Sequence, residues 1–269
     1  MIIFKSIKVL NNNVNFNNNI GFVPTMGALH EGHISLIKAS KRKCQKTIVS
    51  IFINKPQFNK KKDFKNYPTN INKDLKILRK LKVDYLLMPN EKDIYSSNRQ
   101  KKIKINKKDL IMCAKFRSGH FEGVLAVINQ FLIKVKPSVM FLGKKDFQQI
   151  YLIKRFISGK FKTKIVQCKT IRNKNGLPYS SRNVLLNKKD FQTAVNVSKI
   201  IKKFYSTLKL NFKKTKDIYL IKNKIINKNV KLEYLEIRNK LNLSKKINKK
   251  NFKIFIAYYI NGIRLIDNF

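Results

Sequence analysis

Acidic residues are scarce in this 269-residue chain, which has 14 Asp and Glu against 60 Lys and Arg and a formal net charge of +46. Such an excess first suggests a nucleic-acid-binding protein. The basic residues, however, are 51 Lys and only 9 Arg, whereas bidentate contacts to phosphate and guanine favour Arg. They are also spread evenly, with 39 basic and 9 acidic residues over 1–182 and 21 and 5 over 183–269. We therefore expect no specific nucleic-acid partner.

The rest of the composition offers another origin for the charge. The lysines are accompanied by 31 Asn and 35 Ile, while Trp is absent. Lys, Asn and Ile share A- and T-rich codons, so compositional drift of the genome accounts for all three excesses together. A general affinity for polyanions follows from the charge whatever its origin.

Cysteines and long hydrophobic runs are also scarce. Cys44, Cys113 and Cys168 lie far apart with no CxxC pair, which argues against a disulfide framework or a zinc knuckle and favours a reducing cytoplasm. No run approaches the roughly 18 apolar residues of a membrane span, so we expect no membrane partner. Residues 1–5 have too short an apolar run for a signal peptide and no small-residue cleavage site follows, so we expect them in the mature protein.

Short apolar runs alternate with helical patterns through the first two thirds of the chain. The patterns predict strands at 20–23, 47–53, 84–88, 138–142 and 164–168, and helices at 33–42, 72–81, 123–135 and 147–157. This alternation is typical of an α/β fold with a Rossmann-like parallel sheet and helices on both faces. Ligands bind such sheets beyond the carboxyl ends of the strands.

The last third of the chain has a different pattern. It predicts helices at 188–205 and 216–226 and strands at 231–237 and 252–260. We therefore predict two domains: a Rossmann-like ligand-binding domain over 1–175, and a smaller C-terminal α+β domain over 176–269.

The segment PTMGALHEGH (24–33) carries the densest chemical signal. It follows a predicted strand and opens a helix, where backbone N–H groups and the helix dipole bind anions. Two of the three histidines of the chain, His30 and His33, flank Gly32 and could face one phosphate group. No acidic or Cys residue stands at metal-ligand spacing from them, so we predict no protein metal site.

This segment resembles the HIGH signature of the class I adenylyl-transferring superfamily, and the longer string around it resembles the pantoate–β-alanine ligase family. Four further segments resemble that family in the same order: SIFINKPQF (50–58), FRSGHFEGV (116–124), FLGKKDFQQ (141–149) and GLPYSSRN (176–183). Five ordered motifs are a specific signal, although each one alone would be weak.

The resemblance implies a two-step reaction. ATP adenylates the carboxylate of (R)-pantoate and diphosphate leaves, after which the amine of β-alanine attacks the pantoyl adenylate and gives (R)-pantothenate and AMP. The resemblance also implies Mg²⁺, held mainly by phosphates and water, and a homodimer in the cytoplasm.

The family pattern assigns roles to residues of this chain. His33, His30 and Lys145 would be catalytic, with His33 as the usual proton donor. Gln57, Gln149 and Met26 would bind pantoate. The residues expected at ATP are Met26, Gly27, Ala28, Leu29, His30, Glu31, Gly32, His33, Gly143, Lys144, Lys145, Asp146, Ile171, Tyr179, Ser180, Ser181 and Arg182.

Several alternatives stay open at this point. Without the resemblance, Gln57 would be interpreted as a surface amide at a strand end. Arg117 and His120 could contact substrate or support the site, and helix 123–135 could serve the core or a dimer interface. The chain could also be another HIGH-type enzyme, such as a nucleotidyltransferase that keeps the nucleotide on its product.

The chain departs from the family pattern at four positions. Lys144, Phe147 and Tyr179 stand where the family commonly has Glu, Tyr and Met, and Cys113 replaces an acid four positions before Arg117. None of the four is among the residues that the family pattern makes catalytic, so we expect activity to be retained.

Overall fold

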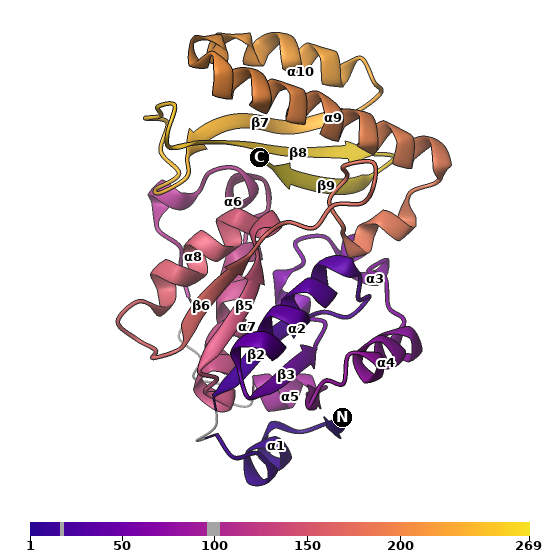
Figure 1. Cartoon of the computed structure of the whole chain (residues 1–269), viewed down its shortest axis with the longest axis vertical. Coiled ribbons are helices and arrows are strands. Elements are labelled where there is room, and N and C mark those ends of the chain that lie inside the picture. Colours follow the sequence, from indigo (N-terminus) through magenta and orange to yellow (C-terminus); the bar gives the residue numbers. More distant parts are fainter. Residues whose placement is uncertain (17–18, 96–102) are drawn as a thin grey trace. The chain divides into compact units, whose positions relative to one another are not determined.

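The computed structural model describes residues 1–16, 19–95 and 103–269 and divides into two compact units, Met1–Ile171 and Arg172–Phe269. The first unit contains a six-stranded sheet in the order β1-β4-β3-β2-β5-β6, in which every neighbouring pair is parallel (Figure 1). The strands are β1 (Ile2–Phe4), β2 (Ile20–Thr25), β3 (Lys46–Ile51), β4 (Tyr85–Leu87), β5 (Val139–Gly143) and β6 (Lys164–Cys168).

Helices cover both faces of this sheet, as the alternating pattern predicts. They are α1 (Ile7–Asn13), α2 (Glu31–Lys43), α3 (Lys61–Lys65), α4 (Ile71–Lys80), α5 (Glu91–Ile94), α6 (Cys113–Phe116), α7 (His120–Val135) and α8 (Phe147–Ile157), with short 3₁₀ turns η1 (Lys55–Gln57), η2 (Lys107–Asp109) and η3 (Lys144–Asp146). Successive strand residues point to opposite faces. Phe22 packs with α1, α7 and α8, whereas the next residue, Val23, packs with α2 and α4.

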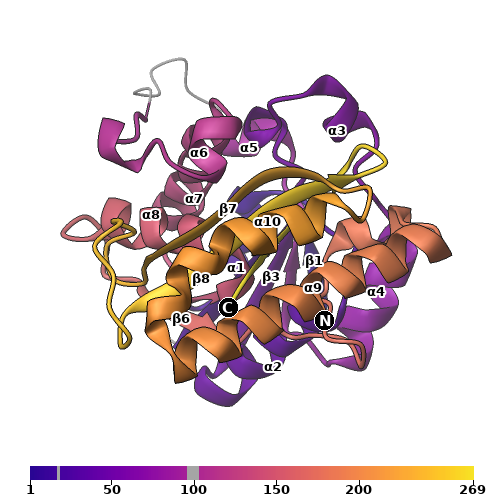
Figure 2. The ribbon, with the colours of Figure 1, turned by 90° about the horizontal axis from the view of Figure 1, so that it is seen from above.

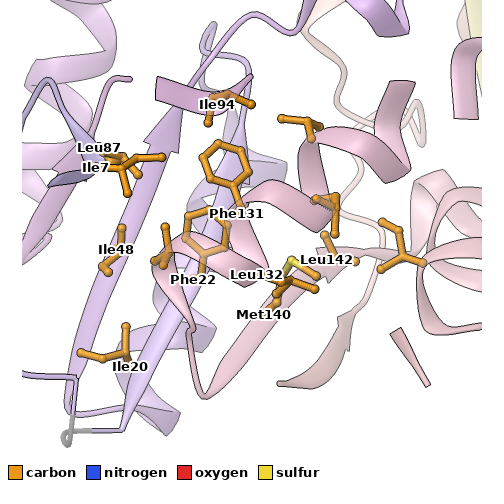
Figure 3. Packing of buried hydrophobic residues seen from close by; sticks show 14 of the residues in the cluster. Ile7, Ile20, Phe22, Ile48, Leu87, Ile94, Phe131, Leu132, Met140 and Leu142 are labelled. Atoms are coloured by element: carbon orange, nitrogen blue, oxygen red, sulfur yellow. The ribbon is translucent and has the colours of Figure 1, made fainter. Parts of the chain in front are cut away.

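Helix α7 belongs to the core of its own unit. Its buried side includes Phe131 and Leu132, and the ring of Phe131 lies 5.2 Å from that of Phe22 in β2, centroid to centroid (Figure 3). Packing within the unit therefore explains the apolar character of this helix. Of the two roles considered for residues 123–135, the structure shows the one in the core.

The second unit is a small α+β layer structure. Its antiparallel sheet has the order β7-β8-β9, and α9 and α10 lie side by side along it around a shared apolar cluster (Figure 2). The elements are η4 (Ser181–Leu185), α9 (Lys188–Leu210), η5 (Phe212–Asp217), α10 (Ile218–Ile226), β7 (Lys231–Asn239), β8 (Phe252–Ile260) and β9 (Ile263–Asn268). The predicted fold class, a Rossmann-like sheet domain with a smaller α+β domain, is confirmed.

Several short elements are missing from the sequence-based prediction. Among them are β1 and α1, which precede the first predicted strand, and β9, which follows the last one. The signal for β9 was present in Asn261-Gly262, where both residues have positive φ (47° and 79°), since such a pair closes a two-residue β-hairpin.

The boundary between the compact units lies earlier than 175/176. Arg172 opens the second unit because its guanidinium pairs with Asp267, at 2.7 and 2.8 Å, and donates to the carbonyl of Gly176 at 3.0 Å. A long-range ion pair of this kind leaves no local mark in the sequence.

A membrane-spanning segment is not found in the described part of the chain, where every helix is too short or too polar to cross a bilayer.

Gly21 provides a test of the packing between β2 and α2. A Cβ at this position would lie 2.1 Å from Ser40 Oγ and 3.0 Å from Cys44 Sγ, and Ser40 cannot turn away without losing its buried 2.8 Å hydrogen bond to Thr47. We expect Gly21→Ala to lower the free energy of unfolding by about 1–3 kcal/mol through overpacking.

The measurement is urea unfolding at 25 °C, with Gly143→Ala as the matched control. Gly143 ends β5 with φ −83°, and a methyl group added there would meet no other atom within 4 Å. Equal stability of the two variants would contradict close packing at Gly21.

Candidate active site

Three loops that follow β2, β3 and β5 come together at the carboxyl edge of the parallel sheet. In the strand order, β2 and β5 are neighbours, with β3 beyond β2 and β6 beyond β5. The chain therefore runs from β2 to β3 in one direction along the sheet, and from β5 to β6 in the opposite direction. A crevice at such a reversal is the usual ligand site of an open α/β sheet. Most of the sequence-predicted residues of the first unit lie in these loops or at the start of the helices that follow them, whereas Ile171 follows β6.

The loop between β2 and α2 is held by a buried carboxylate. Gly27 and Ala28 both have positive φ, 78° and 49°, and such a conformation is strained for alanine. Asp74 in α4 compensates, because its two carboxylate oxygens accept the N–H groups of Ala28 at 2.9 Å and Leu29 at 2.7 Å. The hydroxyl of Thr25 accepts the N–H of Gly27 at 3.2 Å.

No role for Asp74 was predicted from the sequence, although two features of this residue indicate one. It is one of only 14 acidic residues, and it is 1% exposed. Burial raises the pKa of its carboxyl, and the two backbone N–H groups act in the opposite direction. An acidic residue on the buried side of an amphipathic helix points to such a partner.

The two histidines lie against each other at the start of α2. The His30 ring caps the helix by accepting the N–H of Gly32 on Nδ1 at 3.1 Å. The ring centroids of His30 and His33 are 4.0 Å apart with the planes 25° from parallel. His33 Nδ1 is buried and has no hydrogen-bond partner among the described residues. A buried polar atom without a partner is rare and is commonly explained by a missing ligand or water.

Both imidazoles are neutral near pH 7. Burial, then the His33 ring and Lys145, lower the pKa of His30 to about 2. Burial, then Lys145, lower the pKa of His33 to about 4. A neutral imidazole has one N–H donor, and His30 must carry it on Nε2 because Nδ1 accepts from Gly32. The pair therefore presents donors without adding positive charge.

The loop after β3 brings Gln57 to Met26. Gln57 Nε2 lies 2.9 Å from the Met26 sulfur, and its Oε1 accepts from Asn54 Nδ2 at 3.1 Å. The backbone carbonyl of Gln57 is 2.7 Å from His120 Nδ1, and Arg117 lies 2.8 Å from the other ring nitrogen of His120. His120 thus holds the backbone of the Gln57 loop, and Arg117 in turn holds the His120 ring.

The loop after β5 contributes charge. Lys145 pairs with Asp146 at 3.7 Å, and it is close enough to lower the pKa of both histidines. Of the two consecutive glutamines, Gln148 is buried and bonds to backbone groups of Cys113 and Ile111. Gln149 is half-buried on α8, so it is the one of the two that remains a candidate for substrate contact.

The other predicted residues divide between the units. Ile171 closes the first unit, three residues after β6. Ser180 caps η4 by accepting the N–H of Arg182 at 3.3 Å, while Ser181 is buried and Tyr179 half-buried.

The segment that leads to these residues is fixed within the second unit. Gly176 has φ +87° in a tight turn, and the Asn173 side chain accepts the N–H groups of Asn175 and Leu177, both at 3.0 Å. Arg172 adds its bond to the Gly176 carbonyl. A rigid hairpin therefore precedes the predicted phosphate-binding residues.

Over residues 1–16, 19–95 and 103–269, no three His, Cys, Asp or Glu side chains gather closely enough to hold a metal ion.

Comparison with known proteins places these features in a family. The family model for pantoate-beta-alanine ligase matches residues 3–269. The pantothenate synthetase of Francisella philomiragia is 41% identical over 274 residues, which cover 100% of this chain and 97% of the relative. The corresponding protein of Francisella tularensis subsp. mediasiatica is 42% identical over 255 residues, covering 93% and 88%.

Solved structures agree with the sequence relatives. A pantoate-beta-alanine ligase from Francisella tularensis, complexed with beta-gamma ATP and beta-alanine, has a TM-score of 0.87 at 39% identity and covers 100% of this chain and 97% of its own. Pantothenate synthetase from Thermus thermophilus has a TM-score of 0.90 at 25% identity, covering 100% and 99%.

The lowered histidine pKa values predict how stability changes with pH. In the unfolded chain His33 titrates near 6.5, whereas in the folded chain its pKa is about 4. As the pH falls through this window the unfolded state takes up the proton and the folded state does not, so stability falls. We expect His33→Gln to remove on the order of 1–3 kcal/mol of this loss between pH 6.5 and 4.

The check is chemical denaturation at half-unit pH steps for both proteins. His30 acts in the same direction, so a residual slope remains in the variant. An unchanged pH profile in His33→Gln would mean that His33 is not buried as neutral imidazole.

Proposed function

The chain belongs to the pantoate–β-alanine ligase family of enzymes, and on that premise we propose that it condenses (R)-pantoate with β-alanine, using ATP and forming a pantoyl-adenylate intermediate. The products are (R)-pantothenate, AMP and diphosphate. The observation that carries the proposal is the pair of neutral histidines at the start of α2, with Lys145 beside them and with a His33 Nδ1 that has no hydrogen-bond partner in the described part of the chain.

In the first step a carboxylate oxygen of pantoate attacks the α-phosphorus of ATP, and the bond to the bridging oxygen of diphosphate breaks. Charge builds up on the phosphate oxygens, so the site must supply donors and positive potential. The imidazole N–H groups of His30 and His33, the ammonium of Lys145 and the N-terminus of α2 supply them. In this proposal His33 acts as a hydrogen-bond donor in its neutral form.

Pantoate would lie between the loops that follow β2, β3 and β5. The side chains of Gln57, Met26 and Gln149 surround it, and the amides hold its polar groups by hydrogen bonds. Fixing the carboxylate beside the α-phosphate turns a bimolecular encounter into an oriented one, which is a large part of the rate in this type of chemistry.

In the second step the β-alanine amine attacks the acyl carbon, AMP leaves with the bonding electron pair, and the nitrogen loses a proton. We place β-alanine beside Gln57. The Francisella tularensis ligase complexed with beta-gamma ATP and beta-alanine supports both ligands as substrates of this family.

ATP would be held by the backbone of 26–33, by Gly143 to Asp146, by the backbone near Ile171, and by the second-unit residues Tyr179, Ser180, Ser181 and Arg182. Mg²⁺ would travel with ATP, bound by phosphate oxygens and water rather than by a cluster of side chains. We also propose a cytoplasmic homodimer, as the family resemblance implies.

AMP release is the test of the reaction. With ATP, Mg²⁺, pantoate and β-alanine together we expect AMP to form, and we expect its rate to fall to background when either pantoate or β-alanine is left out. AMP appearing at the same rate without pantoate would contradict the proposal. A nucleotidyltransferase that keeps the nucleotide on its product would release diphosphate but no AMP.

His33→Ala tests the histidine. We expect turnover to fall by at least about tenfold because a donor to the transition state is lost, with an unfolding midpoint close to that of the unaltered protein. Lys38→Ala, an exposed position on the same helix, is the control and should keep full turnover. Unchanged turnover in His33→Ala would remove this residue from the mechanism.

A further inference from the structure

We propose that Tyr95 is a positioning residue for the reaction: its hydroxyl orients the side-chain amides of Asn54 and Gln57, so that Gln57 presents an N–H group to pantoate. The inference rests on the proposed function, because it assumes that Gln57 contacts that substrate. No sequence motif pointed to Tyr95.

The three side chains form a chain of hydrogen bonds. The Tyr95 hydroxyl donates to Asn54 Oδ1 at 2.6 Å. Asn54 Nδ2 donates to the backbone carbonyl of Gly123 at 3.0 Å and to Gln57 Oε1 at 3.1 Å. Gln57 Nε2 is then the end of the chain, 2.9 Å from the sulfur of Met26.

The direction of these hydrogen bonds is fixed by the partners at the two ends of the Asn54 side-chain amide. A carboxamide has an oxygen and a nitrogen end of nearly equal shape, so only its partners decide which way it faces. The Gly123 carbonyl can only accept, which requires the nitrogen of Asn54 on that side. A phenol can donate or accept, but burial raises the pKa of Tyr95, so the hydroxyl keeps its proton and donates to the oxygen side.

Asn54 has no alternative arrangement that satisfies its neighbours. It is 1% exposed, so water does not compete for its amide. A reversed amide would set its oxygen against the Gly123 carbonyl, and two facing acceptors in a buried site are strongly unfavourable. Gly123 comes this close because it lacks a side chain: a Cβ there would lie 2.6 Å from the carbonyl of Pro56.

The orientation of the Asn54 amide determines that of the Gln57 amide. Its oxygen is engaged by Asn54, so its N–H₂ group faces Met26. A thioether sulfur is a weak acceptor, and it is easily replaced by a carboxylate, carbonyl or hydroxyl oxygen of a substrate. A Gln57 turned the other way would present its own oxygen to those groups and repel them. The chain from Tyr95 therefore selects for a hydrogen-bond acceptor on the substrate.

Tyr95→Phe is the test, because it removes the hydroxyl and keeps the ring. Losing one hydrogen bond of this kind corresponds to roughly a three- to tenfold effect, and we expect it as a rise in KM for pantoate with KM for ATP unchanged. Tyr85→Phe is the matched control, since Tyr85 lies in β4 against Phe4, outside the chain of hydrogen bonds. Gln57→Glu, which replaces the donor with a carboxylate, should raise KM for pantoate more than Tyr95→Phe does.

A second measurement does not depend on turnover. The side-chain ¹⁵NH₂ signals of Gln57, identified by their loss in Gln57→Glu, should shift in Tyr95→Phe and stay in place in Tyr85→Phe.

The outcomes separate the two proposals. If Gln57→Glu is impaired but Tyr95→Phe keeps both KM values and the Gln57 signals, the positioning role is overturned and the ligase function stands. If KM for ATP rises along with KM for pantoate and the unfolding midpoint falls, Tyr95 is only structural. If the unaltered protein makes no pantoate-dependent AMP, the proposed function fails, whatever Tyr95 does to the signals of Gln57.

Discussion

The buried carboxylate of Asp74 is the contact on which the arrangement of loops at the carboxyl edge of the parallel sheet depends. It accepts two consecutive N–H groups, from Ala28 and Leu29, and so stabilises a left-handed alanine that the chain alone would avoid. Only with that loop in place does α2 begin at the point where the first histidine caps it and the second stacks on the first. A side chain in α4, 46 positions away from Ala28, thus supports the loop that leads to the two histidine rings.

The electrostatics of this edge are local, despite the net charge of +46. Most lysines are solvated and distribute their field over the surface, whereas Lys145 acts at short range on two half-buried rings. Its ammonium and the burial of the rings together keep both imidazoles neutral. In the proposed reaction Lys145 and the N-terminus of α2 supply positive potential, while the histidines supply directed N–H groups. The overall charge adds attraction for an anionic ligand at a distance.

Patterns of apolar residues predicted the fold because the spacing of the buried residues along the sequence differs between strands and helices. The strand at 164–168 and the helix at 147–157 agree with the structure to the residue, and the histidine segment was recognisable because it is contiguous. Asp74 and Tyr95 were not, because their partners lie more than 40 residues away in the sequence. The β9 strand is a different case, since its Asn261-Gly262 turn was a local signal that the prediction overlooked.

The ion pair between Arg172 and Asp267 has a consequence for the topology of the second unit. It joins the first residue of that unit to a residue near its end, 95 positions later, and the Phe269 ring packs on the same guanidinium at 4.1 Å. Side-chain contacts thereby join the beginning of the unit to its end. The hairpin that leads to Tyr179–Arg182 is consequently anchored, through Arg172, to β9 of the antiparallel sheet.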